Sequence, residues 1–310
     1  MKVRYRRIVL LLISITVLSL GMTALFGVRR TEKKESLSVV ASFYPMYTAT
    51  LQVVGEVNGV SVHCLTQPTA GCLHEYQLSP DERMTLEKAD LLILNGAGAE
   101  EFLEPVLFQL SAAVADTSVG LDLPEGCHDH GDEHDGHEHR VNEHCWMSPS
   151  LYAQQVQAIC EALCECDPSN ADVYRANTAQ YRRKIEEVDK RLTATAAALP
   201  FDKAVLFHDS MAYMAETLGL VTVGSLPIGE EQGFSAAEVK TVADAVQGQS
   251  VLFLYDEQYA LRQEGLMAYA AHSAAVSLNS AVLPIDGVAP QEVWLQAMEK
   301  NIQALEEAAA

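Results

Sequence analysis

The chain has 310 residues and a formal net charge of −21 at pH 7, with 42 acidic against 21 basic side chains. Residues 1–37 hold eight basic and two acidic side chains, which leaves 13 basic against 40 acidic, or −27, in the rest of the chain. Because nucleic-acid phosphates are bound by cationic surfaces, this charge argues against nucleic acid as a partner. A negative surface is compatible with attracting cations, although many domains are acidic for solubility alone.

The N-terminal segment is typical of an export signal. Ile8–Val28 is a run of 21 uncharged and largely apolar residues that follows a short basic stretch in residues 2–7. No cysteine lies near its end, so we expect no lipid-modified cleavage site, and both a cleaved signal peptide and a permanent signal anchor stay open. We therefore expect an extracytoplasmic protein, in the periplasm or at the cell surface, with residues 1–37 as the signal and the only contact with a membrane.

From residue 37 to residue 126, short apolar runs alternate with helical patterns, which predicts βα units and a mostly parallel sheet. Ser79 is expected to be an N-cap, because Pro80 and two acidic residues follow it. The expected strands are Leu37–Phe43, Val60–Leu65 and Leu91–Leu94. The expected helical segments are Met46–Val57 after a turn at Pro45, the segment that begins at Ser79, and Glu100–Leu110.

Residues 127–140 (CHDHGDEHDGHEHR) interrupt this alternation with a polar loop. A helix is predicted from Pro149 through Cys164, and an unusually long one from 168 to 199 that contains no glycine and no internal proline. Apolar and aromatic positions of the long helix fall at steps of three, four or seven, as one buried face requires. The positions are Val173, Tyr174, Tyr181, Ile185, Val188 and Leu192.

The alternation of strands and helices then resumes. Strands are expected at Ala204–Phe207, Val221–Val223, Ser250–Tyr255 and Ala275–Leu278. Helices are expected at Met211–Leu218, Ser235–Val246, Gly265–His272 and Gln291–Ala308. The whole pattern predicts an α/β fold of two lobes, each with a mostly parallel sheet flanked by helices, joined by one long rigid helix. We expect the first lobe at 38–167 with the His-rich loop at 127–140, the connecting helix at 168–199 and the second lobe at 200–310.

Seven cysteines in an exported chain suggest disulfides with at least one thiol left over. Cys64 with Cys72, or Cys127 with Cys145, would each close a short loop, but spacing does not determine the pairing. The remaining cysteines (Cys160, Cys164 and Cys166) cluster on or near a helix end.

Ten histidines are present, and their placement is more informative than their number. Half of them lie in the acidic loop: His128, His130, His134, His137 and His139. Flexible tracts of His, Asp and Glu bind zinc, copper or nickel weakly and adaptably. His74, His144 and His208 instead lie at the ends of predicted strands or in loops close to them. Because ligands of open α/β sheets gather at the carboxyl ends of strands, these three side chains are candidates for one shared metal site.

Over nearly all of residues 38–308 the chain resembles the zinc- and manganese-specific solute-binding proteins of ABC importers. The His-rich loop stands where zinc-specific members carry theirs. Five short motifs, highly specific in combination, carry the resemblance. They are Ala41-Ser42-Phe43-Tyr44-Pro45; His74-Glu75-Tyr76 with Ser79-Pro80; Lys88-Ala89-Asp90-Leu91 with Asn95-Gly96; His144-Cys145-Trp146-Met147-Ser148-Pro149; and Phe207-His208-Asp209.

The resemblance implies one metal ion held between the lobes, with His74 and His144 from the first lobe and His208 from the second. Where many members have a fourth, aspartate ligand, this chain has Asn279. A site of three imidazoles without that carboxylate favours Zn(II) over Mn(II), since manganese prefers oxygen-rich sites of higher coordination. Glu75 is the first alternative for the fourth position.

Further acidic residues could complete or support the site. Glu230 and Glu231 are additional candidates for the fourth position, and Asp209 is a candidate acceptor that orients an imidazole. Zinc binding requires neutral imidazoles, so we expect affinity to fall below about pH 6.5.

These features predict a binding protein and not an enzyme: a monomer that passes Zn(II) to the permease and ATPase of an ABC importer. Three histidines with an open position also suit a zinc hydrolase. However, His74-Glu75 is followed by Tyr76-Gln77-Leu78, so the HExxH motif is absent. A surface metal chaperone or adhesin that is not coupled to a permease is the remaining alternative.

Overall fold

The computed structural model describes residues 36–67, 73, 76–124, 141–226, 234–258 and 264–310. The predicted signal at 1–37 and the His-rich loop at 127–140 therefore lie almost wholly outside the described residues. Among the helices that are described, none is both long and apolar enough to cross a membrane.

Two parallel four-stranded sheets form the framework. The first has the order β2-β1-β3-β4, from β1 (Leu37–Ala41), β2 (Val60–Cys64), β3 (Leu91–Leu94) and β4 (Ala113–Asp116). The second repeats this order as β6-β5-β7-β8, from β5 (Lys203–Leu206), β6 (Val221–Ser225), β7 (Ser250–Asp256) and β8 (His272–Leu278). Each sheet with its flanking helices is called a lobe below, and the predicted two-lobe α/β fold is confirmed.

The order of the strands reverses at the first strand of each sheet. β1 lies between β2 and β3, and β5 lies between β6 and β7. In open parallel sheets the loops that leave such a reversal point diverge and open a crevice at the carboxyl ends of the strands. The residues directly after β1 and β5 are therefore placed where a ligand site forms.

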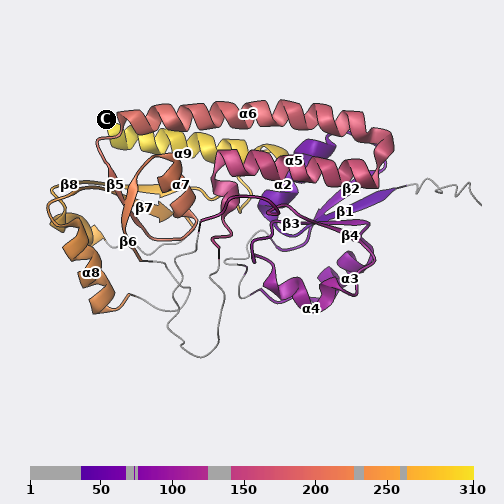
Figure 1. The fold of residues 1–310 in the computed structure, drawn as a ribbon, viewed down its shortest axis with the longest axis horizontal. Coiled ribbons are helices and arrows are strands. Elements are labelled where there is room, and N and C mark those ends of the chain that lie inside the picture. Colours follow the sequence, from indigo (N-terminus) through magenta and orange to yellow (C-terminus); the bar gives the residue numbers. More distant parts are fainter. Residues whose placement is uncertain (1–35, 68–72, 74–75, 125–140, 227–233, 259–263) are drawn as a thin grey trace, which may run out of the picture. The chain divides into compact units, whose positions relative to one another are not determined.

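A layer of helices spans both lobes (Figure 1). α6 (Ala171–Ala198) contacts α2 (Tyr44–Val54), α5 (Pro149–Cys166) and α9 (Val293–Ala309). Beneath this layer one continuous hydrophobic core joins side chains of the first sheet, such as Val39, to those of the second, such as Leu252. The remaining helices lie in the individual lobes: α3 (Pro80–Glu87) and α4 (Glu104–Leu107) in the first, α7 (Met211–Thr217) and α8 (Ala236–Val246) in the second.

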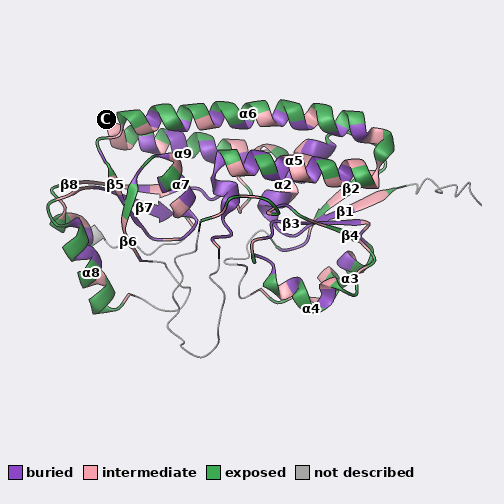
Figure 2. Cartoon of the chain, in the orientation of Figure 1, coloured by how far each residue is buried: buried purple, intermediate pink, exposed green. Residues whose placement is uncertain are grey.

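The long helix is amphipathic, as its sequence predicts. Its buried positions recur at steps of three or four residues, so they form one stripe along the helix, and the opposite face is exposed (Figure 2). They are Ala171, Tyr174, Thr178, Tyr181, Ile185, Val188, Leu192 and Thr195. Val173, which the sequence pattern assigned to the same face, is 44% exposed, because it lies about 100° around the helix from its neighbour Tyr174.

Helix starts follow their capping residues. The predicted N-cap at Ser79 is confirmed: its hydroxyl accepts from the backbone N–H of Glu82, whose carboxylate accepts from the backbone N–H of Ser79. Ser235 and Glu238 form the same reciprocal pair at the start of α8. Each pair satisfies two backbone donors that a helix end would otherwise leave unpaired.

Several boundaries differ from the sequence-based expectations. β4 was not expected; it is a short strand at the edge of its sheet with largely exposed side chains, so it carries no strong apolar pattern. The turn expected at Pro45 is instead the first turn of α2, where proline needs no N–H partner. The helix predicted at Gly265–His272 is a 3-10 helix at Glu264–Tyr269, and His272 already begins β8.

The described cysteines carry free thiols. Cys64 and Cys145 are among them, and the partners suggested for them, Cys72 and Cys127, lie outside the described residues. The predicted cluster near a helix end is confirmed on α5, where the sulfur atoms of Cys160 and Cys164 are 4.0 Å apart.

Leu192→Ala tests the contribution of the buried stripe of α6. Leu192 is fully buried in the continuous core, and truncating such a leucine leaves a cavity, so the free energy of unfolding should fall by about 2–5 kcal/mol. Denaturant titration of the metal-free protein measures the change. Val173→Ala, an exposed position on the same helix, is the matched control and should change stability by less than about 0.5 kcal/mol. Equal effects of the two variants would contradict the assignment of the buried face.

Candidate metal centre

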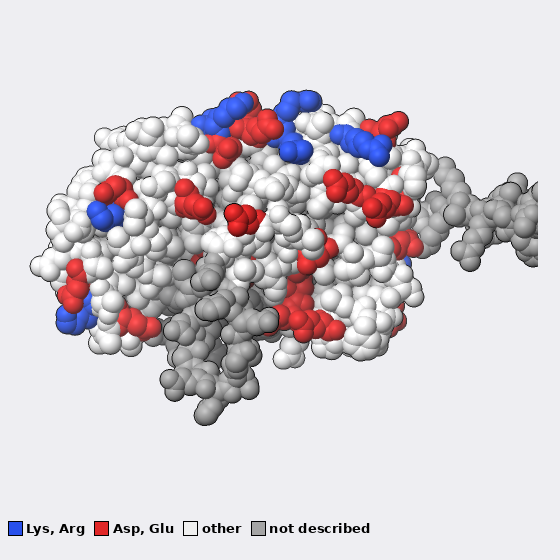
Figure 3. All heavy atoms as spheres, viewed as in Figure 1, with Lys and Arg blue, Asp and Glu red and all other residues white. Residues whose placement is uncertain are grey.

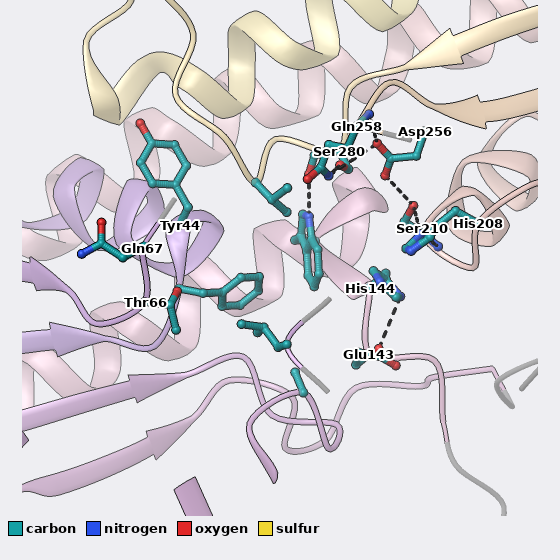
Figure 4. Close-up of a pocket in the computed structure, with 15 residues that line it drawn as sticks. Tyr44, Thr66, Gln67, Glu143, His144, His208, Ser210, Asp256, Gln258 and Ser280 are labelled. Atoms are coloured by element: carbon teal, nitrogen blue, oxygen red, sulfur yellow. Dashed lines mark hydrogen bonds and ion pairs between the residues drawn. The ribbon is translucent and has the colours of Figure 1, made fainter. Parts of the chain in front are cut away.

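A small cavity lies between the carboxyl ends of the two sheets (Figure 4). Its lining includes Phe43, His144, Trp146, His208 and Asp256. The described residues bound a volume of about 50 Å³. That is room for an ion and a few water molecules, and far below the 300–1,000 Å³ of a typical site for an organic ligand.

His144 is presented by the segment that precedes α5. Its ring Nδ1 lies 2.9 Å from the Asn142 Oδ1, and the backbone N–H of His144 donates to the same oxygen over 3.0 Å. The imidazole is 7% exposed and lies beside the Trp146 ring. Burial lowers the pKa of His144 to about 4, in spite of the opposing effect of the neighbouring Glu143 carboxylate. The ring is therefore neutral at pH 7, which is the form that binds metal ions.

The lowered pKa of His144 bears on the expected fall of zinc affinity below about pH 6.5. A threshold near pH 6.5 assumes unperturbed histidines, but burial disfavours the charged form of His144. Protonation of His144 in the metal-free protein therefore begins well below pH 6.5.

His208 is presented by the second lobe, directly after the central strand β5. Its Nδ1 lies 2.7 Å from the Ser210 hydroxyl and 3.2 Å from the Ser210 backbone nitrogen. The Ser210 hydroxyl in turn donates to the Asp256 carboxylate over 3.1 Å. This side chain is connected through Ser210 to a carboxylate at the end of the next strand, β7 (Figure 4).

The two histidines meet across the lobes. Their ring centroids are 5.1 Å apart and the rings are nearly perpendicular. Zinc–nitrogen bonds of 2.0–2.1 Å at tetrahedral angles place two imidazole centroids about 5 Å apart. The spacing of His144 and His208 therefore matches two ligands of one ion.

Of the other predicted site residues, most lie outside the described part of the chain, and Asn279 lies within it. His74, Glu75, Glu230, Glu231 and the loop histidines lie outside the described residues. Asn279 is described and buried at the end of β8.

The side chain of Asn279 has a structural role in the described residues. Its Oδ1 accepts from the backbone N–H of Ala281 over 2.7 Å, and its Nδ2 donates to Glu257. Asn301 of α9 binds the Asn279 backbone on both sides. These bonds hold the turn after β8, and Asn279 does not line the cavity.

No three His, Cys, Asp or Glu side chains of the described part lie close enough together to hold a metal ion. His144 and His208 are the two predicted ligands that the described residues bring together, and the predicted third, His74, follows a described cavity residue, Leu73.

The sequence did not single out Asp256, which lines the cavity, or Asn142, which contacts His144. Asp256 is 2% exposed, and burial raises its pKa against the effect of its hydrogen bonds. Its position at the carboxyl end of β7, beside β5, would have revealed it by the rule that led to His208. Asn142 had no such signal, because its contact with Asp209 depends on the approach of the second lobe and no motif marks its contact with His144.

The role of Asp209 as an acceptor that orients an imidazole stays a prediction. The Asp209 backbone carbonyl accepts from the Asn142 amide. The carboxylate that reaches His208 through Ser210 belongs to Asp256.

Hydrogen bonds hold the segment around His144 to the second lobe. The Trp146 indole donates to the Ser280 carbonyl over 2.8 Å, and the Trp294 indole donates to the Trp146 carbonyl over 3.0 Å. The Tyr213 hydroxyl donates to the Asn142 carbonyl. These donors are buried, so losing any one acceptor would leave an unsatisfied polar group.

The first lobe holds the same segment through Asn95. The Asn95 amide donates to the Glu143 carbonyl over 2.9 Å. The loop that contains Asn95 is fixed by the buried Glu100 carboxylate, which accepts from the Ser42 hydroxyl and from the backbone N–H groups of Asn95 and Gly96. The segment that carries His144 is therefore anchored on both sides.

Charge on the surface is distributed unevenly. Acidic side chains are spread over the visible face, whereas most of the visible basic side chains lie along the long helix α6 (Figure 3). The side of the molecule away from α6 is therefore predominantly negative in this view, and a negative field raises the local concentration of cations.

Comparison with known proteins identifies relatives over almost the whole described chain. Residues 39–308 match the family model described as zinc-uptake complex component A, periplasmic. The high-affinity zinc uptake system protein ZnuA of Bacillus subtilis is 26% identical over 290 residues, or 89% of this chain and 88% of the relative. The zinc-binding lipoprotein AdcA of Streptococcus pneumoniae is 26% identical over 94% of this chain, which spans only 60% of that longer protein.

Solved structures share the fold. A crystal structure of ZnuA matches with a TM-score of 0.67 and 25% identity, over 89% of this chain and 100% of that one. The laminin-binding adhesin Lmb of Streptococcus agalactiae matches with a TM-score of 0.71 and 20% identity over the same shares of the two chains.

Glu100→Gln tests whether the buried Glu100 carboxyl group, which fixes the Asn95 loop, makes the free energy of unfolding depend on pH. Burial raises the pKa of Glu100 to about 7, outweighing its three donors. The folded protein therefore holds this proton more tightly than the unfolded chain does. The free energy of unfolding should fall as pH rises from about 4.5 through 7, by up to about 3 kcal/mol.

The Gln variant should lose this part of the pH dependence. Denaturant titrations of the metal-free protein between pH 4.5 and 8 measure it. Glu101→Gln, an exposed neighbour, is the matched control and should follow the wild-type slope. A Glu100→Gln slope equal to the wild-type slope would contradict the raised pKa.

Proposed function

The chain belongs to the family of periplasmic zinc-uptake components, and on that premise we propose that it captures Zn(II) outside the cytoplasmic membrane and delivers it to an ABC importer. The observation that carries this proposal is the pair of imidazoles, His144 and His208, which meet at 5.1 Å from opposite lobes. Because neither lobe alone has both ligands, the ion is bound where the two lobes face each other.

The proposed ligands are His74, His144 and His208. Three imidazoles suit zinc, which accepts four-coordinate nitrogen-rich sites, better than manganese. Glu75 is the predicted neighbour that completes the set, and Asn279 is the alternative, although its Oδ1 already accepts from the backbone N–H of Ala281. Asp256 lines the same cavity, and it supports the site by supplying negative charge close to the bound ion.

The family membership favours a transport component over the zinc hydrolase. To capture the ion without catalysis, the protein needs unprotonated imidazoles and a route by which the ion can leave. His144 meets the first requirement, because burial keeps its imidazole unprotonated at pH 7.

The cellular setting that we propose follows from this activity. Residues 1–37 act as the export signal or anchor, so that the metal-binding part, residues 38–310, works as a monomer on the extracytoplasmic side. We place the first lobe at 38–167, the connecting helix at 168–199 and the second lobe at 200–310. The partners are the permease and the ATPase of the importer, and the loop at 127–140 binds additional zinc weakly.

Zinc titration by calorimetry tests the shared site. Residues 38–310 should bind one Zn(II) tightly and Mn(II) much more weakly. His208→Ala removes one ligand from the second lobe and should weaken zinc binding by at least about 100-fold. His63→Ala, an exposed histidine of β2, is the control and should bind as the wild type does. Unchanged zinc affinity in His208→Ala would show that the two lobes do not share the ion.

Deletion of residues 128–139 tests the separate role of the loop. If His74, His144 and His208 form the tight site, the deletion leaves one tight zinc site and removes only weak additional binding. The same calorimetric titration, run with excess zinc, resolves the two classes. Loss of the tight site together with the loop would transfer the ligand assignment from the cleft to the loop and favour a metal chaperone.

A further inference from the structure

We infer that Asn142 is a positioning residue that holds His144 in the Nδ1–H tautomer, and so presents Nε2 to the metal ion, while tying His144 to the lobe that carries His208. The geometry stands independently of the proposed function, but its consequence for zinc rests on that function. Asn142 is 2% exposed, and every polar atom of its side chain has a partner.

The orientation of the Asn142 amide follows from two of its contacts. Its Nδ2 lies 3.0 Å from the Asp209 backbone carbonyl, which can only accept a hydrogen bond. Its other side chain atom lies 3.0 Å from the backbone N–H of His144, which can only donate. The amide nitrogen must therefore face Asp209, and the amide oxygen must face His144.

The tautomer of His144 then follows by elimination. Its Nδ1 lies 2.9 Å from the Asn142 Oδ1, and an amide oxygen has no proton to give. The hydrogen bond therefore requires a proton on Nδ1. The Glu143 carboxylate, whose Oε1 lies 3.8 Å from the same nitrogen, favours that proton as well. A neutral imidazole carries only one N–H, so the lone pair is left on Nε2.

His208 shows why this arrangement is particular to His144. Its Nδ1 faces the Ser210 hydroxyl, which donates its proton to Asp256 and so can only accept from His208, and the Ser210 backbone N–H, which can only donate. Those contacts do not select one tautomer. The amide of Asn142 selects one, and it does so before any metal binds.

The amide nitrogen of Asn142, Nδ2, connects the two lobes. Asp209 follows His208 directly in the chain, so the bond from Asn142 to the Asp209 carbonyl links the backbone beside one histidine to the side chain that orients the other. The Tyr213 hydroxyl of α7 adds a second bond from the same lobe to the Asn142 carbonyl. Because the His144 ring is already oriented and the lobes are already at the right spacing, less conformational entropy is lost when the ion binds.

The test uses three variants and two readouts. Asn142→Ala removes both contacts of the amide. Asn142→Asp keeps an acceptor for the Nδ1 proton but loses the donor to the Asp209 carbonyl. Asn301→Ala is the matched control, because Asn301 is equally buried and also bonds backbone groups on both sides, at the Asn279 turn. The readouts are the His144 tautomer, from imidazole nitrogen NMR shifts of the metal-free protein at pH 7, and zinc affinity from calorimetry.

We expect wild-type His144 to be the Nδ1–H tautomer. In Asn142→Ala the Nε2–H form, which free histidine prefers, should appear, and zinc affinity should fall by about 10–100-fold. Asn142→Asp should keep the Nδ1–H tautomer and bind zinc more tightly than Asn142→Ala. Asn301→Ala should lose stability without changing the tautomer.

Three results would overturn the inference. One is a wild-type His144 in the Nε2–H form, which needs no variant to fold. Another is an Asn142→Ala protein with an unchanged tautomer. The third is a loss of zinc affinity no larger than that of Asn301→Ala. Because the tautomer is measured without metal, a correct tautomer in a protein that binds no zinc would refute the proposed function and leave the role of Asn142 intact.

Discussion

One continuous hydrophobic core, shared by both lobes under the helices α2, α5, α6 and α9, is the constraint on which the candidate site depends. His144 and His208 belong to different lobes, so their spacing of 5.1 Å is a property of how the lobes are packed and not of either sheet. Protein interiors are closely packed and hardly compressible. A core that both lobes share therefore allows little movement of one lobe relative to the other. A site divided between two lobes can then keep the spacing of its ligands without a metal.

Hydrogen bonds between the lobes also fix the position of the segment around His144. The segment around His144 receives donors from Tyr213 and Trp294 and donates through Trp146 and Asn142. Burial of this segment also keeps His144 neutral, so the same feature that fixes the ring prepares it as a ligand. The lining of the described cavity thus combines two imidazoles, His144 and His208, with the carboxyl groups of Glu143 and Asp256.

Much of this could be predicted before the structure was known, and the misses have physical causes. The strands and the long helix follow apolar periodicity, which is a local property, and the structure confirms them. β4 was missed because an exposed edge strand lacks that periodicity. The metal-site role of Asn279 stays a prediction from the resemblance; its hydrogen bonds in a turn that depends on Asn301, 22 residues later in the chain, could not be predicted from local sequence.

The sequence by itself determined the α/β class, the two-lobe plan and the histidines at strand ends, because each depends on residue order and short-range spacing. Only the tertiary structure showed that His144 and His208 face each other, that Asp256 reaches His208 through Ser210, and that Asn142 joins the segment of His144 to Asp209. The reason is distance along the chain. Asn142 and the Asp209 carbonyl are 67 residues apart, and contacts of that kind exist only after both lobes have packed on the shared core.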